Sequence, residues 1–261
     1  MKLTAFQIDT FTGRVFSGNP AVVVLVRDWP DDAVLGSIAR EHNISTTAFL
    51  RDAEDGFEIR YLLPIGEVPL VGHASLAAAY VLLHILQPAM DCATLRRRAG
   101  TLRVAVAPDG GVAIRLPAAP ARPCAAPEGL AVALGVPVEE VRVNDAQYFA
   151  VLEDEAAVAR VAPDMDALMR LDRDGVVVTA TGGDHSFVSR AFAPKEGLPE
   201  DPVCGSAHLA LVPYWSARLG KDEHRALQLS PRGGELDCAL EGDQVRLAGR
   251  CALYMEGTIN I

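Results

Sequence analysis

The chain contains the stretch Leu70-Val71-Gly72-His73-Ala74-Ser75-Leu76-Ala77-Ala78-Ala79-Tyr80, in which a glycine separates an apolar lead-in from a run of alanine and leucine. The stretch Val203-Cys204-Gly205-Ser206-Ala207-His208-Leu209-Ala210-Leu211 repeats this pattern about one domain length later. Glycine permits a turn, a small polar side chain can cap a helix, and alanine and leucine propagate helix at little cost. Each stretch therefore predicts a helix that begins at its glycine.

The start of a helix presents unpaired backbone N–H groups and the positive end of the helix dipole, and both attract anions. Two helix starts of one kind, about a domain apart, indicate a duplicated domain with one such start in each half. A duplication of this kind predicts an anionic ligand bound between the two halves.

The bulk composition restricts the class of protein. With 261 residues, the chain has room for one large or two medium domains, and 50% of its residues are hydrophobic. The formal net charge of −10 argues against nucleic acid or an anionic membrane as a partner. Its run of basic residues, Arg96-Arg97-Arg98, is expected to be a solvated strand entrance.

Cysteine usage and the N-terminal sequence bear on location. The five cysteines are odd in number and form no CxxC pair, which favours free thiols in a reducing compartment and no structural zinc. The N-terminus lacks a signal-peptide core, and no apolar run reaches the length that spans a membrane. We therefore expect a cytoplasmic protein with no metal.

The segment Leu116–Pro123 is rich in proline and alanine and is the best candidate for a linker. It predicts an N-terminal half at residues 1–116, to which the C-terminal residues can return, and a C-terminal half at residues 117–261. Each half shows many short strands around one helix of small residues, which is an α+β pattern. The regular βαβ alternation of a dinucleotide-binding fold is missing from the sequence.

Several short motifs, in order along nearly the whole chain, resemble the PhzF-like phenazine biosynthesis family within the diaminopimelate epimerase superfamily. The matching pieces are Gln7–Phe11 with Gly18-Asn19-Pro20, Ser45–Phe49, Gly72–Ser75, Ser189–Pro194, Glu200–His208, and Gln228–Ser230 with Arg232-Gly233-Gly234.

This resemblance implies two pseudo-symmetric halves, each a barrel-like mixed sheet wrapped around a central helix. It implies a cofactor-independent isomerase that moves a proton at carbon next to a carboxylate, and a homodimer. The resemblance also implies that the two helix starts bind the substrate carboxylate. It assigns substrate binding to five residues. These five residues are Asn19, Ser45, Gly72, Ala74 and Gly205.

Two residues are the main candidates for proton transfer. His73 lies in the first turn of the first predicted helix, where the helix dipole favours the neutral imidazole that can donate or accept a proton. The alternative is a polar residue packed at a domain joint. Asp201 precedes the second helix and can orient a substrate amine or hydroxyl, or hold His73 in one tautomer. The alternative for Asp201 is a charge that favours the helix dipole.

Two further polar residues lie in the second helix start. Ser206 occupies the place that His73 has in the first one, and it can cap the helix, bind substrate, or do both. His208 lies two residues farther along and is expected to be a buried partner rather than a catalytic residue.

Thr46 departs from the family pattern. The resemblance implies a glutamate between the Ser and Thr of this segment as the main acid/base, whereas this chain reads Ser45-Thr46-Thr47. A hydroxyl without an activating base cannot replace a carboxylate as proton acceptor at neutral pH. This departure concerns the reaction rather than the fold.

Cys204 precedes the glycine of the second helix, as one of the two proton-transferring thiols does in the epimerases of the superfamily. The helix start is expected to favour its thiolate. Val71 stands where the partner thiol would be, which excludes a symmetric two-thiol racemase. Cys204 is then either a lone base or a small apolar filler.

The sequence thus predicts a PhzF-like isomerase or cyclase that acts on a small carboxylate-bearing metabolite in specialised, antibiotic-type biosynthesis. Two alternatives stay open. One is a catalytically silent homologue that binds a small molecule, and the other is a one-base epimerase or dehydratase that uses Cys204.

Overall fold

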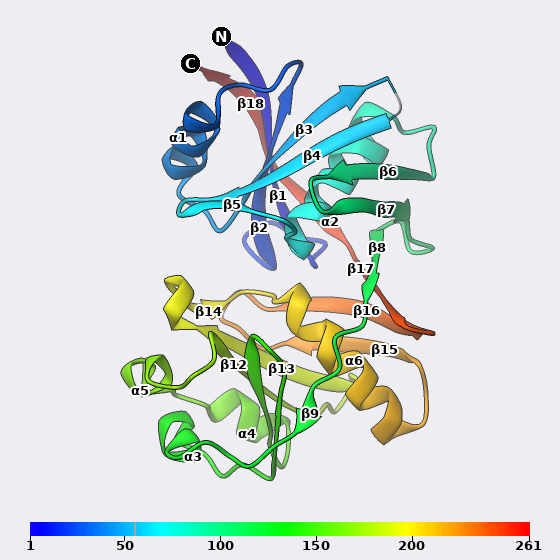
Figure 1. Cartoon of the computed structure of the whole chain (residues 1–261). Helices are drawn as coiled ribbons and strands as arrows, with labels where there is room; N and C mark the ends of the chain where they lie inside the picture. The colour runs from blue at the N-terminus through cyan, green and yellow to red at the C-terminus, as the bar shows by residue number, and fades with distance from the viewer. Residues whose placement is uncertain (55) are drawn as a thin grey trace. The chain divides into compact units, whose positions relative to one another are not determined.

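The computed structural model describes residues 1–54 and 56–261, which form two compact units. Unit 1 comprises Met1–Leu116 and Arg246–Ile261, and unit 2 comprises Pro117–Val245. The C-terminal segment belongs to unit 1 because its strand β18 (Cys251–Asn260) pairs antiparallel with β1 (Lys2–Thr10) over the length of β1. The two chain ends consequently lie side by side (Figure 1).

The described residues of unit 1 form short strands, two α-helices and one π-helical segment. Besides β1 and β18, its elements are β2 (Asn19–Val26), α1 (Asp32–His42), β3 (Thr47–Ala53), β4 (Gly56–Leu63), β5 (Gly66–Val68), α2 (Gly72–Tyr80), η1 (Val81–Leu86), β6 (Cys92–Arg97), β7 (Gly100–Val106) and β8 (Val112–Pro117).

Helix α2 is the central element of unit 1. Its residues His73–Ala79 are all buried, which is typical of a helix that is covered on every side. The small alanine side chains let neighbouring strands approach, and α2 contacts β1, β2, β3, β7 and β18. Helix α1 instead packs one stripe, Leu35, Ile38 and Ala39, against the core cluster that includes Val24 of β2.

Unit 2 contains the remaining elements. They are β9 (Arg122–Pro123), α3 (Leu130–Leu134), β10 (Glu140–Val143), β11 (Gln147–Val151), α4 (Glu155–Arg160), α5 (Met165–Met169), β12 (Gly175–Thr181), β13 (Phe187–Ala193), η2 (Pro194–Glu196), β14 (Leu198–Asp201), α6 (Gly205–Leu219), β15 (Glu223–Gln228), β16 (Gly234–Glu241) and β17 (Gln244–Gly249), which continues into unit 1.

The two units repeat one order of strand pairings. In unit 1, β1–β2 is antiparallel, β2–β3 parallel, β3–β4 antiparallel and β4–β6 parallel. In unit 2, β10–β11 is antiparallel, β11–β12 parallel, β12–β13 antiparallel and β13–β15 parallel. In each unit a buried helix comes just before the last of these strands in the sequence: α2 precedes β6 in unit 1, and α6 precedes β15 in unit 2. The repeated helix pattern in the sequence therefore marks equivalent places in two units of like connectivity.

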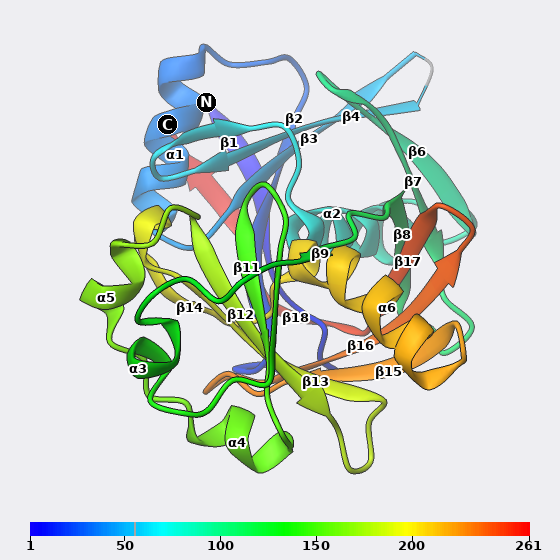
Figure 2. The same ribbon diagram turned by 60° about the horizontal axis from the view of Figure 1, so that its bottom comes forward.

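Helix α6 lies against β15 and β16, as Figure 2 shows for unit 2. It contains Pro213, which has no N–H to donate to the carbonyl of Leu209. The backbone N–H of Ala119 donates to that carbonyl at 2.9 Å instead. A loop residue thus replaces the hydrogen bond that the proline removes. Near the end of α6, the indole of Trp215 donates to the hydroxyl of Thr179 at 3.0 Å.

Several local expectations differ from the structure. Arg96 and Arg97 end strand β6, so the basic run closes a strand and forms the turn to β7 rather than a strand entrance. The sequence also favours a short strand over Gln228–Ser230, but strand β15 ends at Gln228 and the next residues form a turn.

Three further observations concern the described residues. All five cysteines are free thiols. Within residues 1–54 and 56–261, no helix is both long and apolar enough to cross a membrane. The same residues contain no group of three or more His, Cys, Asp or Glu side chains placed to hold a metal ion.

Candidate active site

Helix α2 of unit 1 begins without a side-chain cap. Val71 stands at the capping position in an extended conformation and has no side-chain acceptor. The N–H groups of the first turn, from Gly72, His73 and Ala74, consequently lack a cap and keep the donor character that binds anions. The predicted helix start at Gly72 is confirmed.

The segment after α1 brings Ser45 to this helix start. Helix α1 ends at His42 and is capped by Asn43, which adopts the left-handed conformation (φ 48°) that asparagine tolerates. The hydroxyl oxygen of Ser45 then lies 3.1 Å from His73 Nε2, 3.1 Å from the carbonyl oxygen of Pro20 and 3.5 Å from Asn19 Oδ1. Three residues that were assigned to the site from the sequence are therefore together in unit 1.

The position of Asn19 depends on the glycine before it. Gly18 has φ +63°, and a Cβ there would lie 2.0 Å from the carbonyl oxygen of Thr10. The hydroxyl of Thr10 donates to the carbonyl of Asn19 at 2.9 Å. The Gly18-Asn19 pair thus turns the chain tightly between β1 and β2, where a side chain at the first position would collide with backbone.

His73 is only 7% exposed. Burial lowers the pKa of His73 to about 4, so the imidazole is neutral at pH 7. The expectation of a neutral ring agrees with this result. The main cause is desolvation rather than the helix dipole.

Thr46 is 1% exposed and immediately precedes β3. Its carbonyl accepts a hydrogen bond from the N–H of Val22 at 3.1 Å. The position is therefore enclosed and its backbone is fixed to the neighbouring strand β2.

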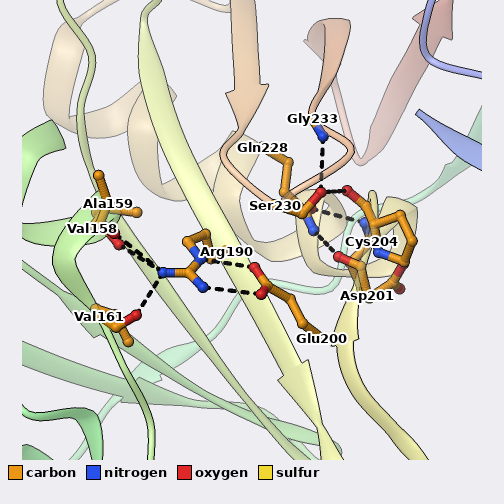
Figure 3. Close-up of polar contacts among 11 residues, drawn as sticks. Val158, Ala159, Val161, Arg190, Glu200, Asp201, Cys204, Gln228, Ser230 and Gly233 are labelled. Carbon is orange, nitrogen blue, oxygen red and sulfur yellow. Dashed lines mark hydrogen bonds and ion pairs between the residues drawn. The ribbon is translucent and has the colours of Figure 1, made fainter. Parts of the chain in front are cut away.

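In unit 2, a glutamine organises the segment between β14 and α6 (Figure 3). The side chain of Gln228 donates from Nε2 to the carbonyl of Asp201 at 2.5 Å and accepts at Oε1 from the N–H of Cys204 at 2.8 Å. Ser230 donates to the carbonyl of Pro202 at 2.7 Å. The carboxylate of Asp201 accepts from the N–H of Val203 at 3.2 Å. These contacts fix the backbone from Asp201 to Cys204.

A bidentate ion pair holds the other side of this segment. Arg190 of β13 donates from Nε and Nη2 to the two carboxylate oxygens of Glu200, at 2.7 and 2.9 Å (Figure 3). Its Nη1 donates to the carbonyl of Val161 at 2.7 Å, just after α4, and lies 3.4 Å from the carbonyls of Val158 and Ala159. Arg190 thus links Glu200, next to Asp201, to the end of α4.

Cys204 is a buried thiol in this structure. Burial and the neighbouring charge of Asp201 raise the pKa of Cys204 to about 12, and its Sγ lies 3.4 Å from the hydroxyl of Ser206. The expectation that the helix start favours the thiolate is wrong, because desolvation outweighs the helix dipole. Ser206 is exposed and does not cap α6, whose capping position is Cys204.

His208 is completely buried, as expected for a packed partner. Its Nδ1 donates to the carbonyl of Cys204 at 2.8 Å, and its ring lies 5.8 Å from that of Phe187. Burial lowers the pKa of His208 to about 4, so the ring is neutral at pH 7.

Because His208 is buried in its neutral form, we expect the free energy of unfolding to depend on pH. Its pKa is lower in the folded chain than the value of about 6.5 expected after unfolding, so the unfolded chain binds the extra proton first. The stabilisation that comes from keeping His208 neutral is fully present above about pH 6.5 and is lost as the pH falls towards 4. The free energy of unfolding is expected to fall by roughly 3 kcal/mol in total over this range.

The measurement is urea unfolding of unit 2 between pH 7 and pH 4, followed by the fluorescence of Trp215 in a Trp29→Phe background. We expect His208→Leu to reduce the fall in unfolding free energy across this range. Equal falls with and without the histidine would contradict the prediction.

The sequence did not single out Arg190, Glu200, Gln228 or Ser230 as partners of the site. All four nevertheless lie in the motif stretches that carry the family resemblance. Membership in those motifs was the available signal. The role of each residue depends on contacts between segments that are distant in the sequence.

The strand-rich units, each with a buried helix and a mixed strand order, are matched by solved structures. A PhzF-family phenazine biosynthesis protein from Enterococcus faecalis has a TM-score of 0.96 and 37% identity, and the match covers 100% of both chains. A hydroxyproline epimerase from Agrobacterium vitis, at 14% identity and a TM-score of 0.64, shares the fold over 99% of this chain and 92% of that one. The protein therefore has the mixed α/β, strand-rich fold of the PhzF and diaminopimelate-epimerase type.

Sequence comparison defines the family. The profile of the phenazine biosynthesis-like proteins matches residues 8–257. Two uncharacterized isomerases of Pseudomonas aeruginosa are 44% and 43% identical over 261 residues, with 100% of each chain covered. The chain belongs to the phenazine biosynthesis-like (PhzF) family, which confirms the resemblance found in the sequence. The expected enzyme class, an isomerase, agrees with the names of these full-length relatives.

Proposed function

We propose that this protein is a cofactor-independent isomerase or cyclase that moves a proton on a small carboxylate-bearing metabolite in specialised biosynthesis. The observation that carries the proposal is the neutral, buried imidazole of His73 at the uncapped start of α2. A neutral imidazole can accept a proton, and uncapped N–H groups can stabilise the charge that then develops on a carboxylate.

In the proposed reaction, His73 takes a proton from a carbon next to the substrate carboxylate. The electron pair of the broken C–H bond delocalises into the carboxylate, where N–H groups of a helix start stabilise it. In a substrate with a C=C bond next to that carbon, the electron pair also reaches the far carbon of the double bond, and return of the proton there shifts the double bond and completes the isomerisation. We assign Asp201 to orient the substrate or take part in this transfer, and Ser206 and the start of α6 at Gly205 to binding.

The lone-thiol alternative receives no support from unit 2. A base must be deprotonated to accept a proton, and the pKa of Cys204 is raised to about 12. The silent binding homologue stays open, because Thr46 lacks the carboxylate that the resemblance implies.

The test is a panel of small carboxylates incubated with the enzyme in deuterated water and followed by proton NMR. The proposal predicts enzyme-dependent loss of a carbon-bound proton signal next to a carboxylate, together with an isomeric product. Binding detected by line broadening without exchange would instead identify the silent homologue. An exchange activity that disappears in Cys204→Ser but survives in His73→Gln would identify the thiol enzyme.

We also propose that Thr46 occupies the position of the family's acid/base glutamate. If so, Thr46→Glu is expected to increase isomerisation of the dihydro-hydroxyanthranilate precursor of phenazines by about tenfold or more, because a positioned carboxylate is a much stronger base than a hydroxyl. The measurement is the initial rate on that precursor, compared with the rate of the wild-type protein.

Thr46→Gln is the matched control, since glutamine has the size of glutamate but no ionisable carboxyl group. An equal rate in the two variants would show that shape rather than basicity matters. Rapid turnover of the precursor by the wild-type protein would contradict the proposal for Thr46 and show that another residue supplies the base.

The oligomeric state is a separate proposal. We propose a homodimer, as the family resemblance implies. Light scattering coupled to size-exclusion chromatography is expected to give twice the chain mass of 27.8 kDa. A single-chain mass at micromolar concentration would contradict it.

A further inference from the structure

The hydroxyl of Ser45 makes its two shortest polar contacts with two different kinds of group. One is the carbonyl oxygen of Pro20 at 3.1 Å, and the other is the ring nitrogen Nε2 of His73, also at 3.1 Å. The side-chain oxygen of Asn19 is more distant, at 3.5 Å. A serine hydroxyl has one proton to donate and lone pairs with which to accept.

The carbonyl of Pro20 can only accept a hydrogen bond. The one proton of Ser45 therefore belongs between Ser45 and Pro20, and the contact with His73 needs its proton from the ring. This places a proton on Nε2 of His73. The opposite arrangement, with Ser45 donating to Nε2, would put two acceptor oxygens 3.1 Å apart with no proton between them. Asn19 does not change this assignment of the protons, because its Oδ1 lies 3.5 Å from the hydroxyl of Ser45 and is too far away to compete for the proton.

Burial removes the remaining possibility, a ring with protons on both nitrogens. The pKa of His73 is about 4, so the doubly protonated ring is rare at pH 7. A neutral imidazole has one nitrogen with a proton and one with a free lone pair. The hydrogen bond made by one nitrogen determines which of the two carries the proton.

We infer that Ser45 is a positioning residue that holds His73 as the Nε2–H tautomer and leaves Nδ1 as the proton-accepting atom. The tautomer follows from the contacts in unit 1 alone. Only the use of Nδ1 in catalysis depends on the function proposed above. The sequence suggested Asp201 for the task of fixing this tautomer, whereas the contacts in unit 1 assign it to Ser45.

His208 of unit 2 provides a contrast within the same molecule. Its Nδ1 lies 2.8 Å from the carbonyl of Cys204, which can only accept, so Nδ1 carries the proton. Its Nε2 is buried without a hydrogen-bond partner among the described residues. The two neutral histidines of the two helix starts are thus expected to be opposite tautomers.

The test is NMR on the full-length protein with 15N-labelled histidine at pH 7. Long-range proton–nitrogen correlations distinguish the two tautomers by the nitrogen shifts and by the pattern of couplings to the ring protons. Signals are assigned with His73→Gln and His208→Leu. We expect the Nε2–H pattern for His73 and the Nδ1–H pattern for His208. An Nδ1–H pattern for His73 in the wild-type protein would overturn the inference.

Variants at Ser45 separate positioning from the intrinsic preference of the ring. Ser45→Ala is expected to move the two nitrogen shifts of His73 towards each other, as tautomers mix, and Ser45→Thr is expected to restore the wild-type pattern. Ser37→Ala, which removes an exposed hydroxyl of α1 that donates to the carbonyl of Ala33, is the matched control and should leave His73 unchanged. An unchanged pattern in folded Ser45→Ala would overturn the role of Ser45. If Ser45→Ala does not fold, the wild-type and Ser45→Thr spectra still decide the tautomer.

Activity adds a separate readout. Where deuterium exchange is found, Ser45→Ala is expected to lower kcat with little change in KM, and Ser45→Thr to recover it. Absence of exchange together with an Nε2–H ring would count against the proposed function and leave the tautomer assignment intact. Exchange together with an Nδ1–H ring would count against this inference alone.

Discussion

Replacing His73 with glutamine is expected to lower the rate of substrate-dependent deuterium exchange by about 10²–10⁴-fold, the usual contribution of a positioned acid or base. Glutamine is chosen because its amide N–H can still donate to Ser45, as Nε2 of the ring does at 3.1 Å. The variant therefore removes the basic nitrogen while it keeps the local hydrogen bond. The measurement is kcat for exchange in deuterated water, together with the melting temperature.

The control variant is His84→Gln in η1, which makes the same substitution elsewhere in unit 1. It should keep full activity. A His73→Gln enzyme that exchanges as fast as the wild type would show that His73 is not the proton-transferring group. If the melting temperature of His73→Gln falls below the assay temperature, the loss of activity comes from unfolding, and this result would instead indicate a structural role.

The helix starts could be predicted from the sequence because their causes are local. Glycine followed by alanine and leucine predicts helices that begin at Gly72 and Gly205, and both begin there. Proline and aspartate before an apolar stripe likewise predict the helix that the structure places at Asp32–His42. In these cases neighbouring residues decide the conformation, and packing decides how much of each helix is covered.

The electrostatics of the site could not be predicted from the same pattern. The dipole of a helix start favours a neutral histidine and a charged thiolate, but desolvation dominates at both His73 and Cys204. How far a side chain is buried depends on strands from elsewhere in the chain. The sequence therefore indicates the direction of the histidine shift correctly and that of the thiol shift wrongly.

The other features that the sequence did not predict depend on contacts between segments that are distant in the chain. Gln228 reaches both Asp201 and Cys204 because β15 pairs with β13 in parallel, with Ser189 opposite Gln228. The sequence does not mark β6 as a strand, because its six residues end in two arginines and carry too little hydrophobic alternation by themselves. Its pairing with β4 and β7 supplies what its own sequence lacks.

Replacing Arg190 with leucine is expected to destabilise unit 2 by about 3–5 kcal/mol, because it leaves a largely buried carboxylate without its partner. The side chains of Arg190 and Glu200 are 12% and 16% exposed, and the same guanidinium also donates to the carbonyl of Val161. The measurement is urea unfolding followed by Trp215, which is 1% exposed, in a Trp29→Phe background so that only unit 2 is reported.

Arg225→Leu is the matched control, because Arg225 pairs with Glu235 at 2.6 Å, with both side chains more than half exposed. Exposed pairs contribute about 0–1 kcal/mol, so this variant should change stability little. The double variant Arg190→Leu/Glu200→Leu should recover part of the loss, since no carboxylate is then left without a partner. A loss no larger than that of Arg225→Leu would show that the Arg190–Glu200 pair does not stabilise the segment before α6.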